Sequence, residues 1–142
     1  MSGIVGNVGS KSGVIGTTEL DYEEGTYSIT DVSGGGLSLT VSSGTARYIK
    51  VGKLIFCTGL VTMPSTSDSN YARFSIPFTS RTDVANSVTG GLAYENSVGG
   101  GAVSMCVNST NGVSIRVDGG GSKTNAEISG KIFRYSVTYY MA

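Results

Sequence analysis

A glycine-rich stretch that ends in a lysine is the part of this sequence nearest to a phosphate-binding loop. Residues 119–124 read Gly-Gly-Gly-Ser-Lys-Thr. A phosphate loop needs a glycine directly before its lysine, a second glycine at a fixed earlier position, and a helix that starts behind them. Here a serine precedes Lys123, and the strand-rich surroundings offer no helix. The stretch therefore predicts a hairpin loop and not a nucleotide site.

Carboxylates and histidines carry most hydrolytic chemistry, and this chain offers little of either. It contains no histidine, which excludes Ser-His-Asp and Cys-His catalysis and most zinc sites. Glu23 and Glu24 are adjacent, so along a strand their side chains point to opposite faces and do not flank one sugar. The other acids are scattered singly. We predict that the chain is not an enzyme and binds no cofactor.

Residues 19–24 (Glu-Leu-Asp-Tyr-Glu-Glu) form the one dense group of acids. Together with backbone carbonyls they could hold Ca²⁺ or Mg²⁺. A solvated or salt-bridged segment is the simpler interpretation. We predict no metal site, while an ion near residues 19–24 stays open as the alternative.

Two cysteines, Cys57 and Cys106, are enough for one disulfide. The N-terminus lacks the charged start and the continuous apolar stretch of a secretory signal, so we expect synthesis in a cytoplasm, where thiols stay reduced. Cys57 also lies in an apolar run, residues 54–61, which predicts a buried thiol. We expect both cysteines to be free.

Aromatic side chains could bind a sugar by stacking. The chain has eight tyrosines and no tryptophan. Tyr135 and Tyr139 share the inward face of the last predicted strand. We interpret most tyrosines as core or interface residues whose hydroxyl groups reach the rim, and a sugar groove stays open as the alternative.

The elements that position these residues are predicted to be strands. The chain has 22 glycines and only 14% charged residues, and glycine disfavours helices. Apolar and polar residues alternate with a period of two from residue 26 onward, which is typical of half-buried strands. Asn111-Gly112 between two such runs favours a tight hairpin turn. The expected strands cover residues 26–32, 37–41, 46–51, 53–63, 71–76, 88–94, 102–108, 113–118 and 132–141.

About nine short antiparallel strands, with turns every 8–12 residues, predict an all-β fold. We expect a β-sandwich that is jelly-roll-like. It forms one domain over residues 21–142, preceded by an extended, Gly-rich arm over residues 1–20.

The strand predicted at residues 53–63 is apolar on both faces, and such a strand is covered on both sides. One face is expected to meet the core and the other a neighbouring subunit or the arm. With the low charge of the chain, this pattern predicts a homo-oligomer, and the homotrimer is what the family resemblance described below adds. The interface candidates are Ile55, Val61, Met63, Tyr135 and Tyr139.

The arm carries a short internal repeat, because Ser-Gly-Ile-Val-Gly at residues 2–6 returns as Ser-Gly-Val-Ile-Gly at residues 12–16. Such small apolar pairs between glycines do not build a core of their own. They can lie extended on another surface, and we predict that Ile4, Val5, Val14 and Ile15 dock the chain on a partner.

Charge and hydropathy bound the remaining partners. The net charge is zero at pH 7, which argues against binding to nucleic acid. No apolar run approaches the length of about 18 residues that spans a bilayer. We expect neither nucleic-acid binding nor membrane insertion.

Three short motifs, in order along the chain, resemble a β-domain common in structural proteins of tailed bacteriophages, particularly marine and cyanobacterial ones. Residues 20–27 (Leu-Asp-Tyr-Glu-Glu-Gly-Thr-Tyr) match its "DxEEGTWTP" opening. Residues 48–55 (Tyr-Ile-Lys-Val-Gly-Lys-Leu-Ile) match "YxKIGxLV", and residues 76–80 (Ile-Pro-Phe-Thr-Ser) match "LPFTS". The start of the chain, Met-Ser-Gly-Ile-Val-Gly, is also similar to that of many short marine-phage virion proteins.

The resemblance implies a trimeric, jelly-roll-like module displayed on a virion, made in the host cytoplasm, with no catalytic residues. Because 142 residues leave little room for a shaft, we favour capsid decoration or a head fibre docked on the major capsid protein. A tail-fibre or spike tip that binds a host-surface glycan is the alternative. A small carbohydrate-binding module is a more distant one.

The chain departs from the family pattern at two places. Tyr27 replaces the expected tryptophan and Ser28-Ile29 replaces Thr-Pro, so the entry to the first strand is expected to pack differently. Residues 81–121 carry no motif of the family, and we expect a ligand-facing loop to vary there.

Overall fold

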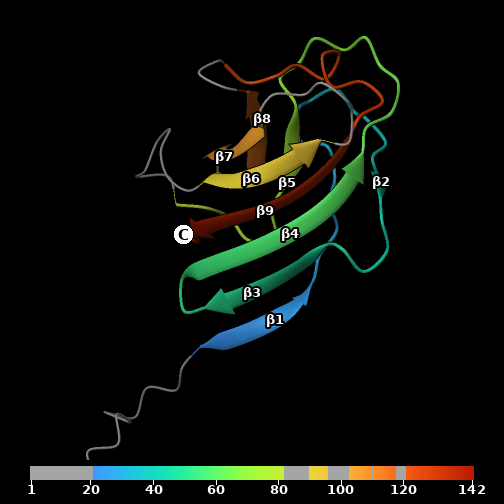
Figure 1. Cartoon of the computed structure of the whole chain (residues 1–142). Coiled ribbons are helices and arrows are strands. Elements are labelled where there is room, and N and C mark those ends of the chain that lie inside the picture. Colours follow the sequence, from blue (N-terminus) through green and yellow to red (C-terminus); the bar gives the residue numbers. More distant parts are fainter. Residues whose placement is uncertain (1–20, 82–89, 96–102, 110, 118–120) are drawn as a thin grey trace, which may run out of the picture.

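The computed structural model describes residues 21–81, 90–95, 103–109, 111–117 and 121–142, and this part of the chain is all-β (Figure 1). Its backbone forms strands and turns, in keeping with the predicted fold class. The strands are β1 (Tyr22–Thr26), β2 (Thr40–Val41), β3 (Arg47–Val51), β4 (Leu54–Thr62), β5 (Arg73–Ser75), β6 (Gly90–Glu95), β7 (Val103–Ser109), β8 (Gly112–Val117) and β9 (Ile132–Tyr140).

All the strands join in one antiparallel sheet. Its order is β1-β3-β4-β9-β6-β7-β8-β5, and the short β2 pairs with the end of β4. The sheet curls into a half-barrel, which is consistent with a jelly-roll-like β-sandwich (Figure 1). The predicted all-β class is therefore confirmed. Among the described residues no helix is long and apolar enough to cross a membrane.

The core lies on the concave face of this curled sheet, because every second side chain of each long strand points there. Along β4 and β9 buried and more exposed residues alternate through nine residues each. Phe74 on β5 is the central contact: its ring stacks on Tyr135 with centroids 6.0 Å apart and lies 6.4 Å from the ring of Phe133. The two halves of the sheet therefore share one core.

Two glycines let neighbouring groups approach β4 and β9 closely. A Cβ at Gly59 would stand 2.7 Å from the ring of Tyr135 and 2.6 Å from Ile29. A Cβ at Gly91 would collide with the backbone of Ser136 on β9. A side chain at either position would push the core or the β6–β9 pair apart.

Several predicted strands are confirmed with small shifts of their ends. The two-faced strand is β4, the last strand is β9, and residues 46–51 contain β3. The hairpin around Asn111-Gly112 is the β7–β8 pair, in which Val107 pairs with Val113 and Val103 with Val117. Residues 37–41 form strand only at their end, as β2.

The strand expected at residues 26–32 was placed too late in the sequence. The strand is β1, Tyr22–Thr26, within the acidic segment. After Tyr27, the chain crosses from β3 to β5: the Tyr27 N–H donates to Ala46 O at 3.2 Å, whereas the Ser75 N–H donates to Thr30 O at 2.9 Å. Residues 27–32 thus connect the two ends of the sheet instead of extending one strand.

Candidate functional site

The convex side of β1, β3, β4 and β9 carries a continuous group of exposed apolar side chains. Directly opposed residues of antiparallel strands share a face, and one row runs from Tyr22 through Val51 and Leu54 to Tyr140. In the next row, Ile49 stands beside Phe56. The six side chains are 38–54% exposed and are called the outer apolar face: Tyr22, Ile49, Val51, Leu54, Phe56 and Tyr140.

The five interface candidates from the sequence lie on the other face of the same strands. Ile55, Val61, Met63, Tyr135 and Tyr139 are each at most 5% exposed, within the core. Their assignment to a subunit interface was wrong, because both faces of β4 are apolar and alternation alone does not say which one points inward. The face of β4 that is open to another molecule is the one with Leu54 and Phe56.

A shallow depression of about 460 Å³ lies next to the outer apolar face, over β1, β3 and β4. Phe56 and Ile49 contribute apolar walls, and Glu24 and Arg47 contribute opposite charges. The Tyr22 hydroxyl donates to Glu24 at 2.9 Å, and this hydrogen bond raises the pKa of Tyr22 above its usual value. The depression therefore combines aromatic surface with hydrogen-bonding groups of both kinds.

Salt bridges fill the acidic segment on the opposite side of β1. Lys50 Nζ lies 3.0 Å from Asp21 and 3.6 Å from Glu23, and the hydrogen bond to Asp21 raises the pKa of Lys50. The Tyr48 hydroxyl donates to Glu23. Asp21 and Glu23 are therefore salt-bridged, whereas residues 19 and 20 lie outside the described residues. In the described ranges no group of three or more potential metal ligands occurs.

Three further tyrosines have hydrogen-bonded hydroxyl groups: Tyr135 and Tyr139 are buried in the core, and Tyr27 is partly buried against it. Tyr27 donates to Thr58 O at 3.1 Å and is 3.1 Å from the Tyr135 hydroxyl, which therefore donates to Tyr27. Burial raises the pKa of Tyr27 and of Tyr135. Tyr139 donates to Phe78 O at 2.9 Å and accepts from its N–H. These hydrogen bonds tie the three rings to the backbone of the fold.

Both cysteines are free. Cys57 points into the core from β4, and burial raises the pKa of its thiol to about 11. Cys106 is on β7, and β9 and β6 lie between the two strands. At about 4.8 Å per strand this separation is too large for a disulfide. The chain thus holds the two thiols apart by its topology.

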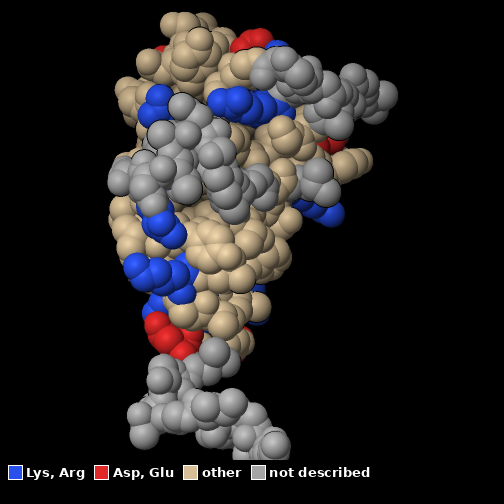
Figure 2. Space-filling model, turned by 90° about the vertical axis from the view of Figure 1, so that its left-hand side faces the viewer, with Lys and Arg blue, Asp and Glu red and all other residues tan. Residues whose placement is uncertain are grey.

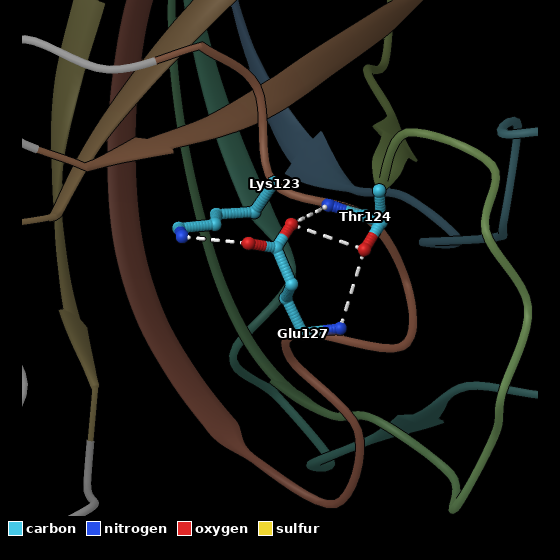
Figure 3. A network of polar contacts seen from close by, with 3 residues as sticks. All are labelled: Lys123, Thr124 and Glu127. Carbon is cyan, nitrogen blue, oxygen red and sulfur yellow. Dashed lines mark hydrogen bonds and ion pairs between the residues drawn. The ribbon is translucent and has the colours of Figure 1, made fainter.

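Lys123, the lysine of the glycine-rich stretch, is held in a loop by a carboxylate (Figure 3). Its Nζ is 2.8 Å from Glu127 Oε1, while Glu127 Oε2 accepts from the N–H and the hydroxyl of Thr124. The Glu127 N–H donates back to Thr124 Oγ1 at 3.3 Å, which completes a capping box around the turn. The lysine is therefore part of a structural turn, and residues 118–120 lie outside the described residues.

The capping box makes stability depend on acid pH. Hydrogen bonds from Lys123 and from the Thr124 backbone lower the pKa of Glu127 from 4.5 to about 2. A carboxyl with a lowered folded-state pKa contributes stability above its unfolded pKa and loses it as the pH falls through the folded value. We expect the melting temperature to fall between about pH 4.5 and pH 2. Glu127→Gln should weaken that part of the pH dependence.

The control for this prediction is Glu24→Gln, which changes an exposed glutamate on β1. Melting curves of the three proteins across the acid range would compare the slopes. Equal slopes for the natural chain and Glu127→Gln would contradict the role given to the capping box.

The proposed anchors of the arm, Ile4, Val5, Val14 and Ile15, lie outside the described residues. The chain enters the described part at Asp21, next to β1. Since β1 ends the sheet order, the arm joins the molecule at the margin of the outer apolar face.

Charge does not dominate the surface seen in Figure 2, where Lys, Arg and acidic side chains are spread around a broad area of uncharged residues.

No protein-family model matches the chain, and no curated protein or solved structure is significantly similar to it.

The outer apolar face was partly visible in the sequence. The two apolar faces of β4 indicated that an apolar surface would remain, and Leu54 and Phe56 are on it. Its other members, among them Ile49 and Tyr140, depend on strand order, which places β3 and β9 on either side of β4. The sequence signal that could have found the β3 members is the alternation of Ile49 and Val51 with Tyr48 and Lys50.

Proposed function

We propose that this chain is a non-catalytic structural protein of a tailed bacteriophage virion that works as a homotrimer. The outer apolar face is the observation that carries the proposal. Soluble monomers rarely expose large continuous apolar patches, and such patches mark interaction sites. Here six large side chains stand together across β1, β3, β4 and β9.

A second copy of the chain is the occupant that best fits this face. Arg47 and Glu24 lie at its margin, so two copies would present both signs of charge to each other. The net charge of zero adds no repulsion between copies. Cyclic packing of three copies buries the face and protects the free edge of β1 without leaving an open end. The motifs shared with trimeric phage β-domains favour the number three.

Attachment to the particle is assigned to the arm. Residues 1–20 precede the sheet and carry the repeated apolar pairs, so a trimer would present three such arms. In this proposal the partner is the major capsid protein, and the trimer decorates or cements the capsid or forms a head fibre. No cofactor, nucleic acid or membrane takes part, and the place of the protein is the virion.

The depression beside Phe56 favours a second candidate function, a tail-fibre or spike tip that binds a host-surface glycan. An aromatic ring flanked by a carboxylate and a guanidinium is suited to a sugar, which offers both apolar faces and hydroxyl groups. Phe56, Glu24 and Arg47 supply these groups. In this second candidate function, the same trimer would stand at the tip of a tail fibre or spike.

Purified phage particles test the proposal by their protein inventory. Quantitative mass spectrometry should find this chain in the virion at a fixed copy number. Hundreds of copies per particle indicate capsid decoration, and a handful indicates a tail component. Absence from washed particles, while the chain is abundant in the infected cell, would contradict a virion function.

A further inference from the structure

Two arginines stand beside each other on β5 and β8, and neither has an acidic partner among the described residues. Arg73 pairs with Ser114 in the β5–β8 register, and Arg116 is two residues further along β8. Positions two apart on a strand share a face, so both side chains project on the same side of the sheet. Diagonal neighbours of this kind have Cβ atoms about 7 Å apart, which is within reach of one small ligand between two long side chains.

Both guanidinium groups are partly buried and incompletely satisfied. The Nε atoms of Arg73 and Arg116 are shielded from solvent and have no hydrogen-bond partner. A buried donor without a partner is costly, and more so when it carries a charge. Two like charges at this separation also repel each other. The pair is therefore an unfavourable arrangement unless an anion neutralises it.

The described carboxylates are engaged elsewhere. The lysines at positions 50, 123 and 131 each have an acidic partner at 3.0 Å or less. Asp31 accepts from two backbone N–H groups of its own loop, and Asp68 accepts from Asn70 and Asn125. Glu24 accepts from Tyr22. Within the described ranges, no acid is shown paired with the two arginines.

We infer that Arg73 and Arg116 bind a phosphate- or sulfate-type oxyanion. A carboxylate has two oxygens, which one guanidinium fork already engages in a bidentate pair. Two forks call for an anion with three or four oxygens. Serines surround the pair: Ser104 is opposite Arg116 on β7, and Ser122 bridges to it from the other side. Their hydroxyl groups are additional donors for such an anion.

This inference is independent of the proposed virion function, because it concerns the part of the sheet remote from the outer apolar face. β5 and β8 end the sheet order opposite to β1. Loss of the oligomer would leave the arginine pair intact, and loss of the anion site would leave the outer apolar face intact.

Melting temperature in the presence of inorganic phosphate tests the site. Sodium phosphate and sodium sulfate at low millimolar concentration are compared with sodium chloride of equal ionic strength. A ligand that binds only the folded chain raises the melting temperature, by about 2–6 °C at ten times its Kd. Arg73→Gln and Arg116→Gln should each lose this shift. Without anion, each variant should be at least as stable as the natural chain, because one unpaired charge is gone.

Arg134→Gln is the matched control, since it removes an exposed arginine from β9, and it should keep the phosphate shift. Titration calorimetry with phosphate compares the natural chain, the two arginine variants and this control by their Kd values. Glucose 6-phosphate tells whether the natural ligand is a phosphate ester or the free ion. A site for a phosphate ester binds glucose 6-phosphate, and a site for the free ion does not.

Several results would overturn the inference. The inference is wrong if phosphate does not raise the melting temperature of the natural chain. It is also wrong if the rise persists in both arginine variants, or if acetate raises the melting temperature equally. Glu19, Asp83 and Asp118 are the acidic residues outside the described ranges, and Asp83 and Asp118 are the two nearest in sequence to β5 and β8. If phosphate does not raise the melting temperature of the natural chain but does raise that of Asp83→Asn or Asp118→Asn, the two arginines belong to an internal salt bridge and not to an anion site.

Discussion

Phe56→Asp should convert the native oligomer into folded monomers. Phe56 is 41% exposed in the single chain and lies in the second row of the outer apolar face, beside Ile49. A buried aromatic residue at the centre of an interface often contributes about 2–4 kcal/mol to association, and a buried unpaired carboxylate would add a further cost. The expected loss of affinity at each interface is therefore about 30-fold to 1,000-fold.

Folding of the monomer should be unaffected by Phe56→Asp, because its side chain is outside the core. Substitutions at exposed positions usually change stability by about 0.5 kcal/mol or less. Tyr71→Asp is the matched control: Tyr71 is 56% exposed and faces Thr124 near β5. Sedimentation of both variants and of the natural chain compares their masses. An oligomer that survives Phe56→Asp and dissociates with Tyr71→Asp would move the interface to the other end of the sheet.

Deletion of residues 2–16 should abolish incorporation into particles and leave the trimer folded. The core residues in the described part of the chain lie between Ile29 and Tyr139, and the deletion removes none of them. Each buried anchor of the arm contributes about 1.5–3 kcal/mol before ordering costs. Ordering some fifteen residues costs roughly 1–2 kcal/mol apiece for the backbone. A single arm is therefore weak, and three tethered arms supply the affinity.

Point variants separate anchoring from the mere presence of an arm. Ile4→Asp combined with Val14→Asp keeps the length of the arm and removes one anchor from each repeat. Copy number per particle should fall steeply in this variant, whereas Lys11→Gln, between the repeats, should leave it unchanged. If the deleted chain still decorates particles at the normal copy number, the docking surface lies on the sheet.

Local patterns in the sequence were sufficient to find the long strands. β9 alternates in polarity along its nine residues, β4 is a largely apolar run of nine residues, and the runs on both sides of Asn111-Gly112 have matching lengths, which places the β7–β8 hairpin. These signals are local, so no knowledge of the distant chain was needed.

Contacts distant in the sequence explain what was missed. Residues 27–32 look like a strand, but their hydrogen bonds go first to Ala46 and then to Ser75, and no local pattern encodes this crossing. The acidic residues of β1 form a strand through backbone pairing with β3, and Lys50 on β3 compensates the charge of Asp21 and Glu23. Their charge therefore misled a prediction based on propensity.

The candidate sites also depend on register. Which face of β4 points inward is decided by its neighbours, and the Tyr135 ring fits against Gly59 only on the concave side. Arg73 and Arg116 are separated by more than forty residues, and only the pairing of β5 with β8 brings them together. Neither result follows from the composition of one segment.

The molar mass of the purified chain in solution tests the central claim, that the outer apolar face binds further copies of the chain. Light scattering on the 142-residue chain at micromolar concentration should give three times the mass of one chain, which is 14.6 kDa. The Phe56→Asp variant should give the mass of a single chain. A folded, monomeric natural chain under these conditions would contradict the account.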